Sequence, residues 1–507
     1  MKLFRSILYL FAWIGQIALG YLLGKRVWAL EMIPFRVFFI GCILLILLWA
    51  LEVFLYLRGI RLEKQGKGGK SSRIAAFTLI LLSLLVSVIG IFAANKLQHT
   101  LHSVTEPKVA TTSFSVFVLK DDPAQTIADM DGYLLGVATS FDTENTNEAI
   151  RRLSEKTPSS LKTEDHDTVQ EMVDALYAEK AGAILLNSAY VPILEETEGY
   201  ETFGEDTRAL YDIDVVMQSQ PAASSGSHAR PTENLVSVPV VTQDPFVVYL
   251  SGSDTRSDVL LTGNSDVNIL VAVNPATKNI LLLNTPRDYY IPNPAGDGAL
   301  DKLTHCGVYG ISCSVQALSD LYDETINYYA QINFKGFESL INAVGGITVD
   351  SDYAFTTRIG HYQISKGPNQ LNGAQALGFV RERYFFNTGD NQRGLNQMKA
   401  ITAVIQKLTA GNVITHYNSI LDSLQGMFVT SFSSKELSDL VKMQLNDGAD
   451  WNVHSFAVTG SNGMELTYSI PRTRLSVMYQ DKALVAKAAN LLDRVISGET
   501  ISDEDVL

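Results

Sequence analysis

Three long runs of apolar residues stand near the start of the 507-residue chain, at positions 7–24, 37–57 and 74–94. Each run is long enough to cross a bilayer as a helix, and none ends in the small-residue cleavage site of a signal peptide. A buried helical hairpin is the alternative, but the runs precede any plausible globular core and have basic flanks. The pattern therefore predicts a membrane anchor over residues 1–96.

The charges between the apolar runs predict the orientation of this anchor. The connection at 58–73 is rich in Lys and Arg, far more so than the first connection. Because basic loops stay on the cytoplasmic side, we expect this loop and the chain start to be cytoplasmic. Everything after Lys96 is then extracellular, which makes the protein a multi-pass protein of the cell membrane. Glu52, close to the basic loop, is expected at the membrane interface.

Beyond the anchor, the hydrophobic pattern changes to that of a small α/β domain over 112–218. Alternating apolar residues predict strands and helical spacing predicts helices. The predicted strands are 113–120, 133–139 and 183–187, and the predicted helices are 145–156 and 168–180. The acidic run Glu195-Glu196-Thr197-Glu198 is interpreted as a solvated face, with a metal site as the weaker alternative.

A linker at 219–244 is predicted next, since its first half is small, polar and punctuated by Pro221 and Pro231. A second domain over 245–497 then alternates strands with helices. The predicted strands are 246–251, 267–274, 279–284 and 347–350, and the predicted helices are 314–322, 334–344 and 393–408. Strands 267–274 and 279–284 are expected to pair across a short connection. This alternation predicts a layered α/β fold.

Net charge and cysteine content narrow the functional classes. The formal charge is −14, and no basic stripe with interleaved aromatic residues is present, so no nucleic-acid partner is expected. Of three cysteines, Cys42 lies in an apolar run, whereas Cys306 and Cys313 share the outer region. The latter two form either a disulfide or two free thiols, since so short a loop gains little chain-entropy stabilisation.

Charged clusters at the ends of predicted strands are the candidate functional site. They are Gly252-Ser253-Asp254-Thr255-Arg256, Asn264-Ser265-Asp266, Pro286-Arg287-Asp288, Arg381-Glu382-Arg383 and Asp390-Asn391-Gln392-Arg393. Strand ends present side chains from a rigid sheet. Paired carboxylates suit a divalent cation and arginines suit oxyanions, so the clusters predict a phosphate or pyrophosphate site. A glycine-rich phosphate loop is absent, so side chains would hold the phosphates.

The residues of these clusters and their order along the chain resemble the motifs of the LytR-CpsA-Psr family of Gram-positive envelope enzymes. The residues that carry the resemblance are Gly252-Ser253-Asp254, Ser265-Asp266, Pro286-Arg287-Asp288, Asp301-Lys302-Leu303, Asn333-Phe334 with Gly345-Gly346, Leu371-Asn372-Gly373 with Gln375-Ala376-Leu377, Val380-Arg381-Glu382-Arg383, and Gly389-Asp390 with Arg393 and Gln397. The three spans and the domain that precedes the linker resemble the capsule-associated CpsA branch.

The resemblance implies an α-β-α catalytic domain with a mixed central sheet. It also implies transfer of a glycopolymer, here capsular polysaccharide, from an undecaprenyl-pyrophosphate carrier to peptidoglycan through a phosphodiester. Asp254 and Asp266 would hold Mg²⁺, with Mn²⁺ as an alternative ion. Arg287, Arg381 and Arg383 would clamp the phosphate oxygens. If 380–383 is an extended strand, the last two arginines face the same way.

Further residues take subordinate roles under this resemblance. Lys302, Arg393 and Gln397 would be secondary contacts to the pyrophosphate. Asp390 would either orient Arg383 or Arg393 or act as the general base for the acceptor hydroxyl. Many family members have arginine before the Ser-Asp pair, where this chain has Asn264, so one phosphate contact is missing or is replaced by Arg256.

Asp288, Asp301 and His305 are expected to have structural or orienting roles. The plain alternative for the whole set is an ordinary network of surface ion pairs. The agreement of order and spacing with one family favours the functional interpretation.

Three other functions are alternatives to this transferase. A lipid-pyrophosphate hydrolase would take water as the acceptor at an identical site. A non-catalytic module would bind polyprenyl phosphate and recruit polymer machinery. A membrane-bound regulator would have to act on nucleic acid, which an extracellular acidic domain argues against.

Overall fold

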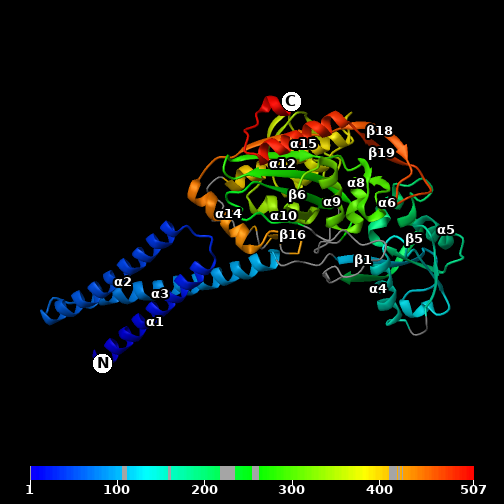
Figure 1. Cartoon of the computed structure of the whole chain (residues 1–507). Helices are drawn as coiled ribbons and strands as arrows, with labels where there is room; N and C mark the ends of the chain where they lie inside the picture. The colour runs from blue at the N-terminus through cyan, green and yellow to red at the C-terminus, as the bar shows by residue number, and fades with distance from the viewer. Residues whose placement is uncertain are drawn as a thin grey trace. The chain divides into compact units, whose positions relative to one another are not determined.

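A computed structural model describes residues 2–105, 111–157, 161–216, 235–253, 262–409, 420, 423–424 and 426–507. The chain divides into two compact units (Figure 1). The first comprises Met1–Glu106 and Phe432–Ala449, and the second comprises Pro107–Ser431 and Asp450–Leu507. The predicted boundaries at 96, 112, 218, 244 and 497 stay predictions.

The first unit contains three long apolar helices, as the hydrophobic runs predict. They are α1 (Lys2–Ala29), α2 (Phe35–Lys64) and α3 (Lys70–Thr105), and the shorter α14 (Ser434–Asp447) belongs to the same unit. Within the part of the chain that the structure describes, three segments are long and apolar enough to cross a membrane: Ser6–Ala29, Phe35–Lys64 and Lys70–His102. Most of their large apolar side chains are exposed, which suits helices whose solvent is lipid.

Glu52 lies inside this helix bundle, and its expected place at the membrane interface stays a prediction. Its side chain is fully buried, and the Gln16 amide nitrogen donates to the Glu52 carboxylate at 3.0 Å. The same nitrogen lies 2.9 Å from the Ser83 hydroxyl, so the three polar side chains join α1, α2 and α3. A polar group among apolar helices is costly unless it is paired, and Gln16 supplies the pairing that the local sequence around Glu52 does not reveal.

The first part of the second unit is a five-stranded sheet with strand order β3-β2-β4-β1-β5. Its strands are β1 (Thr111–Leu119), β2 (Leu134–Val137), β3 (Lys162–Asp165), β4 (Ala183–Asn187) and β5 (Thr207–Val216). Its helices are α4 (Thr143–Ser154), α5 (Val169–Tyr177), α6 (Val191–Glu195) and α7 (Phe203–Asp206), of which α4 and α5 are labelled beside β1 and β5 in Figure 1. The three strands and two helices predicted for this segment are confirmed, with ends shifted by up to three residues.

The larger part is built on a six-stranded sheet with strand order β16-β11-β6-β7-β8-β17. The strands are β6 (Phe246–Ser253), β7 (Ser265–Asn274), β8 (Asn279–Asn284), β11 (Tyr328–Asn333), β16 (Phe428–Thr430) and β17 (Asn452–Ala457). Strands β6, β7 and β8 are antiparallel neighbours, whereas β11 runs parallel to β6 and β17 runs parallel to β8; β16 is antiparallel to β11. The sheet is therefore mixed, and the predicted pairing of β7 with β8 is confirmed.

Two sets of helices cover this sheet. The first set is α8 (Leu303–Cys306), α9 (Ile311–Tyr322) and α15 (Lys482–Ile496), and the second is α10 (Phe334–Ala343), α11 (Gly373–Arg381) and α12 (Asp390–Thr409). Alternate strand residues such as Tyr249, Leu270 and Leu283 share a core with α9 and α15. Helices α10 to α12 form a second core, and α12 also contacts β7, β8 and β17. The layered α/β prediction is correct.

Short sheets and a terminal helix complete the unit. The paired strands are β9 (Tyr290–Pro292) with β10 (Leu300–Lys302), β12 (Ile347–Ser351) with β15 (Gly367–Leu371), β13 (Phe355–Thr356) with β14 (Gln363–Ile364), and β18 (Gly460–Glu465) with β19 (Leu475–Gln480), and the helix is α16 (Asp503–Val506). The turn from α10 into β12 uses Gly345 and Gly346, both with positive φ, a conformation that glycine adopts without strain.

The two sheets of this unit share one hydrophobic core. Ile193 and Leu194 of α6 are fully buried in the same cluster as Val308 and Tyr309, which follow α8. The Tyr190 and Tyr309 hydroxyls lie 2.8 Å apart in the buried interior. The backbone of α6 is therefore anchored against the larger sheet, although more than a hundred residues separate the two partners in the sequence.

Candidate functional site

Four strand termini lie at one edge of the six-stranded sheet. Ser253, the last residue of β6, pairs with Ser265, the first residue of β7. Asn333, the last residue of β11, pairs with Ser253 from the other side. Strand β8 is antiparallel to β7, so its last residue, Asn284, lies toward this same edge and leads into Arg287. The sheet thus brings the described residues of the first three predicted clusters to one edge.

Arg287 is the centre of this edge. Its side chain is only 9% exposed, and its guanidinium bonds two carboxylates at 2.8 Å, Asp266 through Nη1 and Glu196 through Nη2. A third carboxylate, Asp288, lies 3.8 Å from Nε. Burial alone would lower the Arg287 pKa, but the three carboxylates outweigh burial and raise it. The cation is thus permanent, and its planar fork faces two oxygen acceptors, the geometry that phosphate oxygens also satisfy.

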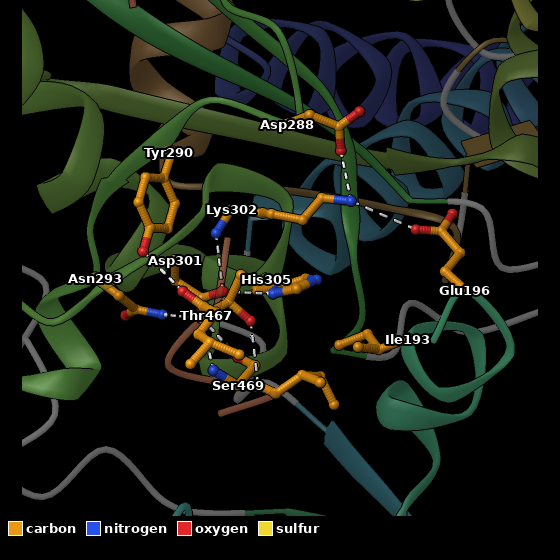
Figure 2. Close-up of polar contacts among 12 residues, drawn as sticks. Ile193, Glu196, Asp288, Tyr290, Asn293, Asp301, Lys302, His305, Thr467 and Ser469 are labelled. Carbon is orange, nitrogen blue, oxygen red and sulfur yellow. Dashed lines mark hydrogen bonds and ion pairs between the residues drawn. The ribbon is translucent and has the colours of Figure 1, made fainter. Parts of the chain in front are cut away.

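Lys302 supplies a second buried cation beside Arg287. Its ammonium is 2.7 Å from Asp288 and 3.5 Å from Glu196, and its side chain is 4% exposed. Figure 2 shows the Lys302 nitrogen between these two carboxylates. Burial would raise the Asp288 pKa, but Lys302 and then Arg287 lower it below its usual value. Asp288 therefore stays ionised and orients the two cations, as expected for a structural carboxylate.

Next to Lys302 in the sequence, the fully buried Asp301 connects the segments that carry Asn293, His305 and Ser469 (Figure 2). Its oxygens accept hydrogen bonds from the Ser469 hydroxyl at 2.6 Å and from the Asn293 amide at 3.1 Å, and lie 2.6 Å from His305 Nδ1. Burial would raise the Asp301 pKa, but His305 and these hydrogen bonds lower it. The structural roles expected for Asp301 and His305 fit this geometry.

We expect Asp301→Asn to lower the free energy of unfolding by about 3 kcal/mol, because it removes one partner of a buried, fully hydrogen-bonded charge. The folded-state pKa of Asp301 is below its unfolded value, so its contribution is complete above about pH 4 and declines as the pH falls further. Thermal melts of the variant and the wild type should therefore differ most near neutral pH and converge in acid.

Asp297→Asn is the matched control for this measurement. Asp297 is an exposed carboxylate in the turn that precedes β10, with a φ of 51°, a conformation that asparagine also tolerates. Its melting temperature should stay at the wild-type value. Equal losses in both variants would contradict the role given to Asp301.

Asp390 and Arg393 lie in the first turn of α12 and form an ion pair of 2.5 Å. Burial raises the Asp390 pKa, while Arg393 and Arg287 oppose that rise. Gly394, one turn further along α12, lies against the side chain of Asn284 at the end of β8, so the start of this helix is near the edge already described. Of the two arginines that Asp390 was expected to orient, it pairs with Arg393.

Gln397, one turn further along α12, donates to the Val380 carbonyl at 3.5 Å and is only 8% exposed. The contact joins α12 to the last turn of α11. In this structure Gln397 therefore links two helices. Its expected contact with pyrophosphate stays a prediction.

The extended strand expected at 380–383 is wrong, because Arg381 is the last residue of α11 and Arg383 lies in the turn after it. The capping box of Asn372 and Gln375 starts a helix that runs through Val380. Arg381 stacks on the Phe334 ring with its guanidinium carbon 4.1 Å from the centroid, and Arg383 donates to the Tyr384 hydroxyl at 2.9 Å. The two arginines are therefore not related by strand alternation, and their joint clamp stays a prediction.

Two predicted site residues, Asp254 and Arg256, lie outside the described residues. Asp254 directly follows Ser253, the end of β6. Elsewhere in the described ranges, no group of three or more His, Cys, Asp or Glu side chains is arranged to hold a metal. Asp266 does offer a hard oxygen donor, and its side chain is 14% exposed.

Cys306 and Cys313 are two buried free thiols rather than a disulfide. The Cys313 thiol donates to the side-chain oxygen Oδ1 of Asn293 at 3.2 Å. A hydrogen bond with Cys313 and burial raise the Cys306 pKa, so this thiol stays protonated.

Glu196 is the site residue that the sequence did not reveal. It directly follows α6, in the acidic run interpreted as a solvated face, yet its carboxylate bonds Arg287 and Lys302. Burial would raise the Glu196 pKa, but the two cations outweigh it and lower that pKa. The residue is 91 positions before Arg287, and no local pattern distinguishes it from the neighbouring Glu195 and Glu198.

A sequence model of the LytR_cpsA_psr family matches residues 213–483, more than half of the chain. The chain belongs to the LytR-CpsA-Psr family. The match contains Asp266, Arg287, Lys302, Asp390 and the other clusters of the sheet edge. A second model, described as DNA polymerase processivity factor, matches residues 70–186, from within α3 to β4, and covers less than half of the chain.

Curated relatives of this LytR-CpsA-Psr chain carry the name polyisoprenyl-teichoic acid–peptidoglycan teichoic acid transferase TagU. That of Enterococcus faecalis is 34% identical over 200 residues, which cover 39% of this chain and 65% of the relative. That of Oceanobacillus iheyensis is 34% identical over 225 residues, covering 43% and 68%. The chain thus spans about two thirds of the length of these relatives.

Solved structures are similar to about half of the chain. The crystal structure of Bacillus subtilis TagV is 24% identical and aligns over 51% of this chain and 99% of that one, with a TM-score of 0.43. Protein gbs0355 from Streptococcus agalactiae is 29% identical over 51% of this chain and 90% of that one, also with a TM-score of 0.43.

Proposed function

We propose that this protein is a membrane-anchored transferase that moves a glycopolymer from a polyprenyl-pyrophosphate carrier to peptidoglycan and leaves a phosphodiester between them. The observation that carries the proposal is the pair of buried cations, Arg287 and Lys302, at a sheet edge inside the family segment. Two fixed cations match a ligand with two linked phosphates. The names of the TagU relatives support a glycopolymer and peptidoglycan as the two substrates.

The chemistry assigned to the site is a displacement at the phosphorus next to the glycan. An acceptor hydroxyl of peptidoglycan would attack that phosphorus, and the bond to the bridging oxygen would break, releasing polyprenyl phosphate. Arg287 and Lys302 would hold the non-bridging oxygens, with Arg381, Arg383 and Arg393 as further contacts. Asp390, whose pKa is raised, would accept the proton of the attacking hydroxyl.

A divalent cation is part of the proposal. Asp266, with one oxygen bonded to Arg287, and Asp254 would hold Mg²⁺ or Mn²⁺, which would offset the charge of the pyrophosphate. The proposed polymer is capsular polysaccharide, on the resemblance to the CpsA branch, and the proposed location of residues after the third span is extracellular, on the basic loop at 58–73.

The test is product analysis with the full chain in detergent. The protein would be incubated with a polyprenyl-pyrophosphate glycan, peptidoglycan fragments and Mg²⁺, and the products would be identified by mass spectrometry. We expect glycan joined to peptidoglycan by a phosphodiester, together with polyprenyl phosphate. A reaction without peptidoglycan is the control. Glycan phosphate alone would indicate a hydrolase, and bound lipid without turnover would indicate a binding module.

A further inference from the structure

Glu196 occupies the place of an anionic ligand between the two buried cations. Its two oxygens lie 2.8 Å from Arg287 Nη2 and 3.5 Å from Lys302 Nζ (Figure 2 shows the Lys302 contact). A phosphate held by the same two side chains would present two oxygens in the same way. The carboxylate and a substrate phosphate therefore need the same hydrogen-bond donors.

Glu196 is more exposed to solvent than Asp266 and Asp288, the other two carboxylates that contact Arg287 or Lys302. Its side chain is 43% exposed, compared with 25% for Asp288 and 14% for Asp266. Its backbone is anchored, because Ile193 and Leu194 are buried in the common core and the Thr197 hydroxyl donates to the Ile193 carbonyl at 2.6 Å. The fold thus fixes the helix end at the site while the carboxylate keeps access to solvent and can rotate away.

The charges around Glu196 affect how a phosphate would bind at this edge. The charged groups gathered at the edge, among the described residues, are the cations Arg287, Lys302 and Arg393 and the carboxylates Glu196, Asp266, Asp288 and Asp390. Glu196 adds a carboxylate to two cations that already have Asp266 and Asp288 as partners, so an incoming phosphate meets cations that are already paired. Removal of the Glu196 carboxylate takes away one of these anionic partners.

We propose that Glu196 is an internal competitor for the pyrophosphate site, through which the small N-terminal α/β domain sets the site's selectivity among anions. A pyrophosphate, with more charge and two linked groups, displaces the carboxylate, whereas a monophosphate competes with it poorly. The carboxylate then returns to Arg287 and Lys302 when polyprenyl phosphate leaves. The substrate class in this inference rests on the proposed function, but the competition itself concerns only anion binding.

The test is calorimetric titration of the full chain in detergent with inorganic pyrophosphate and, separately, inorganic phosphate, at fixed ionic strength. Glu196→Gln keeps the size of the side chain and removes its charge. We expect the variant to bind both anions more tightly, by about fivefold for pyrophosphate, the effect of losing a partly exposed ion pair. The ratio of pyrophosphate to phosphate affinity should fall, because the phosphate gains more.

Glu198→Gln is the matched control. Glu198 is an exposed carboxylate of the same acidic run and forms no ion pair with any described residue, so this variant should bind both anions like the wild type. An equal gain in anion affinity in both variants would show that the lost negative charge acts at long range, and it would contradict a direct competition by Glu196. Unchanged or weaker pyrophosphate binding in Glu196→Gln would overturn the proposal, and weaker binding would make Glu196 a positioning residue for Arg287.

The transfer assay separates this inference from the proposed function. If Glu196→Gln tightens anion binding while neither protein forms the phosphodiester product, the competitor is supported and the transferase is not. If the wild type transfers glycan and Glu196→Gln has an unchanged KM for the lipid substrate as well as unchanged anion affinity, the transferase is supported and the competitor is refuted.

Discussion

Replacing Arg287 with alanine should lower the rate of glycopolymer transfer by about a thousandfold. The proposed reaction gathers negative charge on the phosphate oxygens, and a buried guanidinium with two parallel donors is the strongest group available to stabilise it. Turnover would be measured on the full chain with saturating lipid-linked glycan. The apparent KM for that substrate should rise as well, because Arg287 would also bind the ground state.

Two further variants distinguish this effect from unfolding. Arg287→Ala leaves Asp266 and Asp288 without their shared cation, so it should also melt at a lower temperature. Arg287→Lys keeps the charge without the fork, and we expect it to melt near the wild type yet remain strongly impaired. Arg474→Ala removes an exposed arginine paired with Glu465 and should change neither property. Wild-type turnover in a folded Arg287→Ala protein would remove the clamp from the mechanism.

Asp266→Asn should lower metal-dependent transfer by at least about a hundredfold. A bound metal ion stabilises the negative charge of the transition state at a phosphoryl group by several kcal/mol. Each 1.4 kcal/mol in the activation barrier corresponds to about tenfold in rate. The amide also loses the charged hydrogen bond that holds Arg287 Nη1. Rates would be measured as a function of Mg²⁺ and Mn²⁺ concentration, and the half-saturating concentration should rise together with the loss of maximal rate.

The comparison variant is Asp320→Asn, an exposed carboxylate on α9 that accepts a hydrogen bond from Gln316. It should leave the metal dependence unchanged. If Asp266→Asn loses activity with the same metal dependence as the wild type, Asp266 acts through Arg287 alone, and the metal proposal loses its described ligand.

The contact between Glu196 and the two cations bears on both predictions. In the wild type, Arg287 is already bonded to a carboxylate that is not part of the sheet edge, so part of any substrate affinity is used to displace it. Variants at Arg287 and Asp266 are therefore best compared in the wild-type background and with Glu196→Gln. Effects of residues in one ion-pair network are not additive.

The strands that carry the site could be predicted from the sequence because their signals are local. An uninterrupted apolar run or an alternation over six to ten residues predicts a strand, and β6, β7 and β8 were expected within two residues of their observed ends. Charged clusters directly after such strands have to lie at the sheet edge. Membrane-length apolar runs are detectable for the same reason, since their length and composition suffice.

The region of Arg381 and Arg383 shows the limit of local pattern. Alternating charges at 381–383 match an extended strand, but the capping box at Asn372 starts a helix whose register continues through Arg381. The competing signal was nine residues upstream. The strand prediction failed because it considered the cluster without the start of its own helix.

By itself, the sequence determined the three apolar spans, the mixed α/β alternation and the ordered clusters that place the chain in its family, since each depends on neighbouring residues or their order. Only the tertiary structure decided that Glu52 bonds Gln16 inside the helix bundle and that Glu196 reaches Arg287. Both contacts join residues 36 to 91 positions apart. Such pairs depend on which apolar faces pack together, and an isolated glutamate carries no local signal of the cation it will meet.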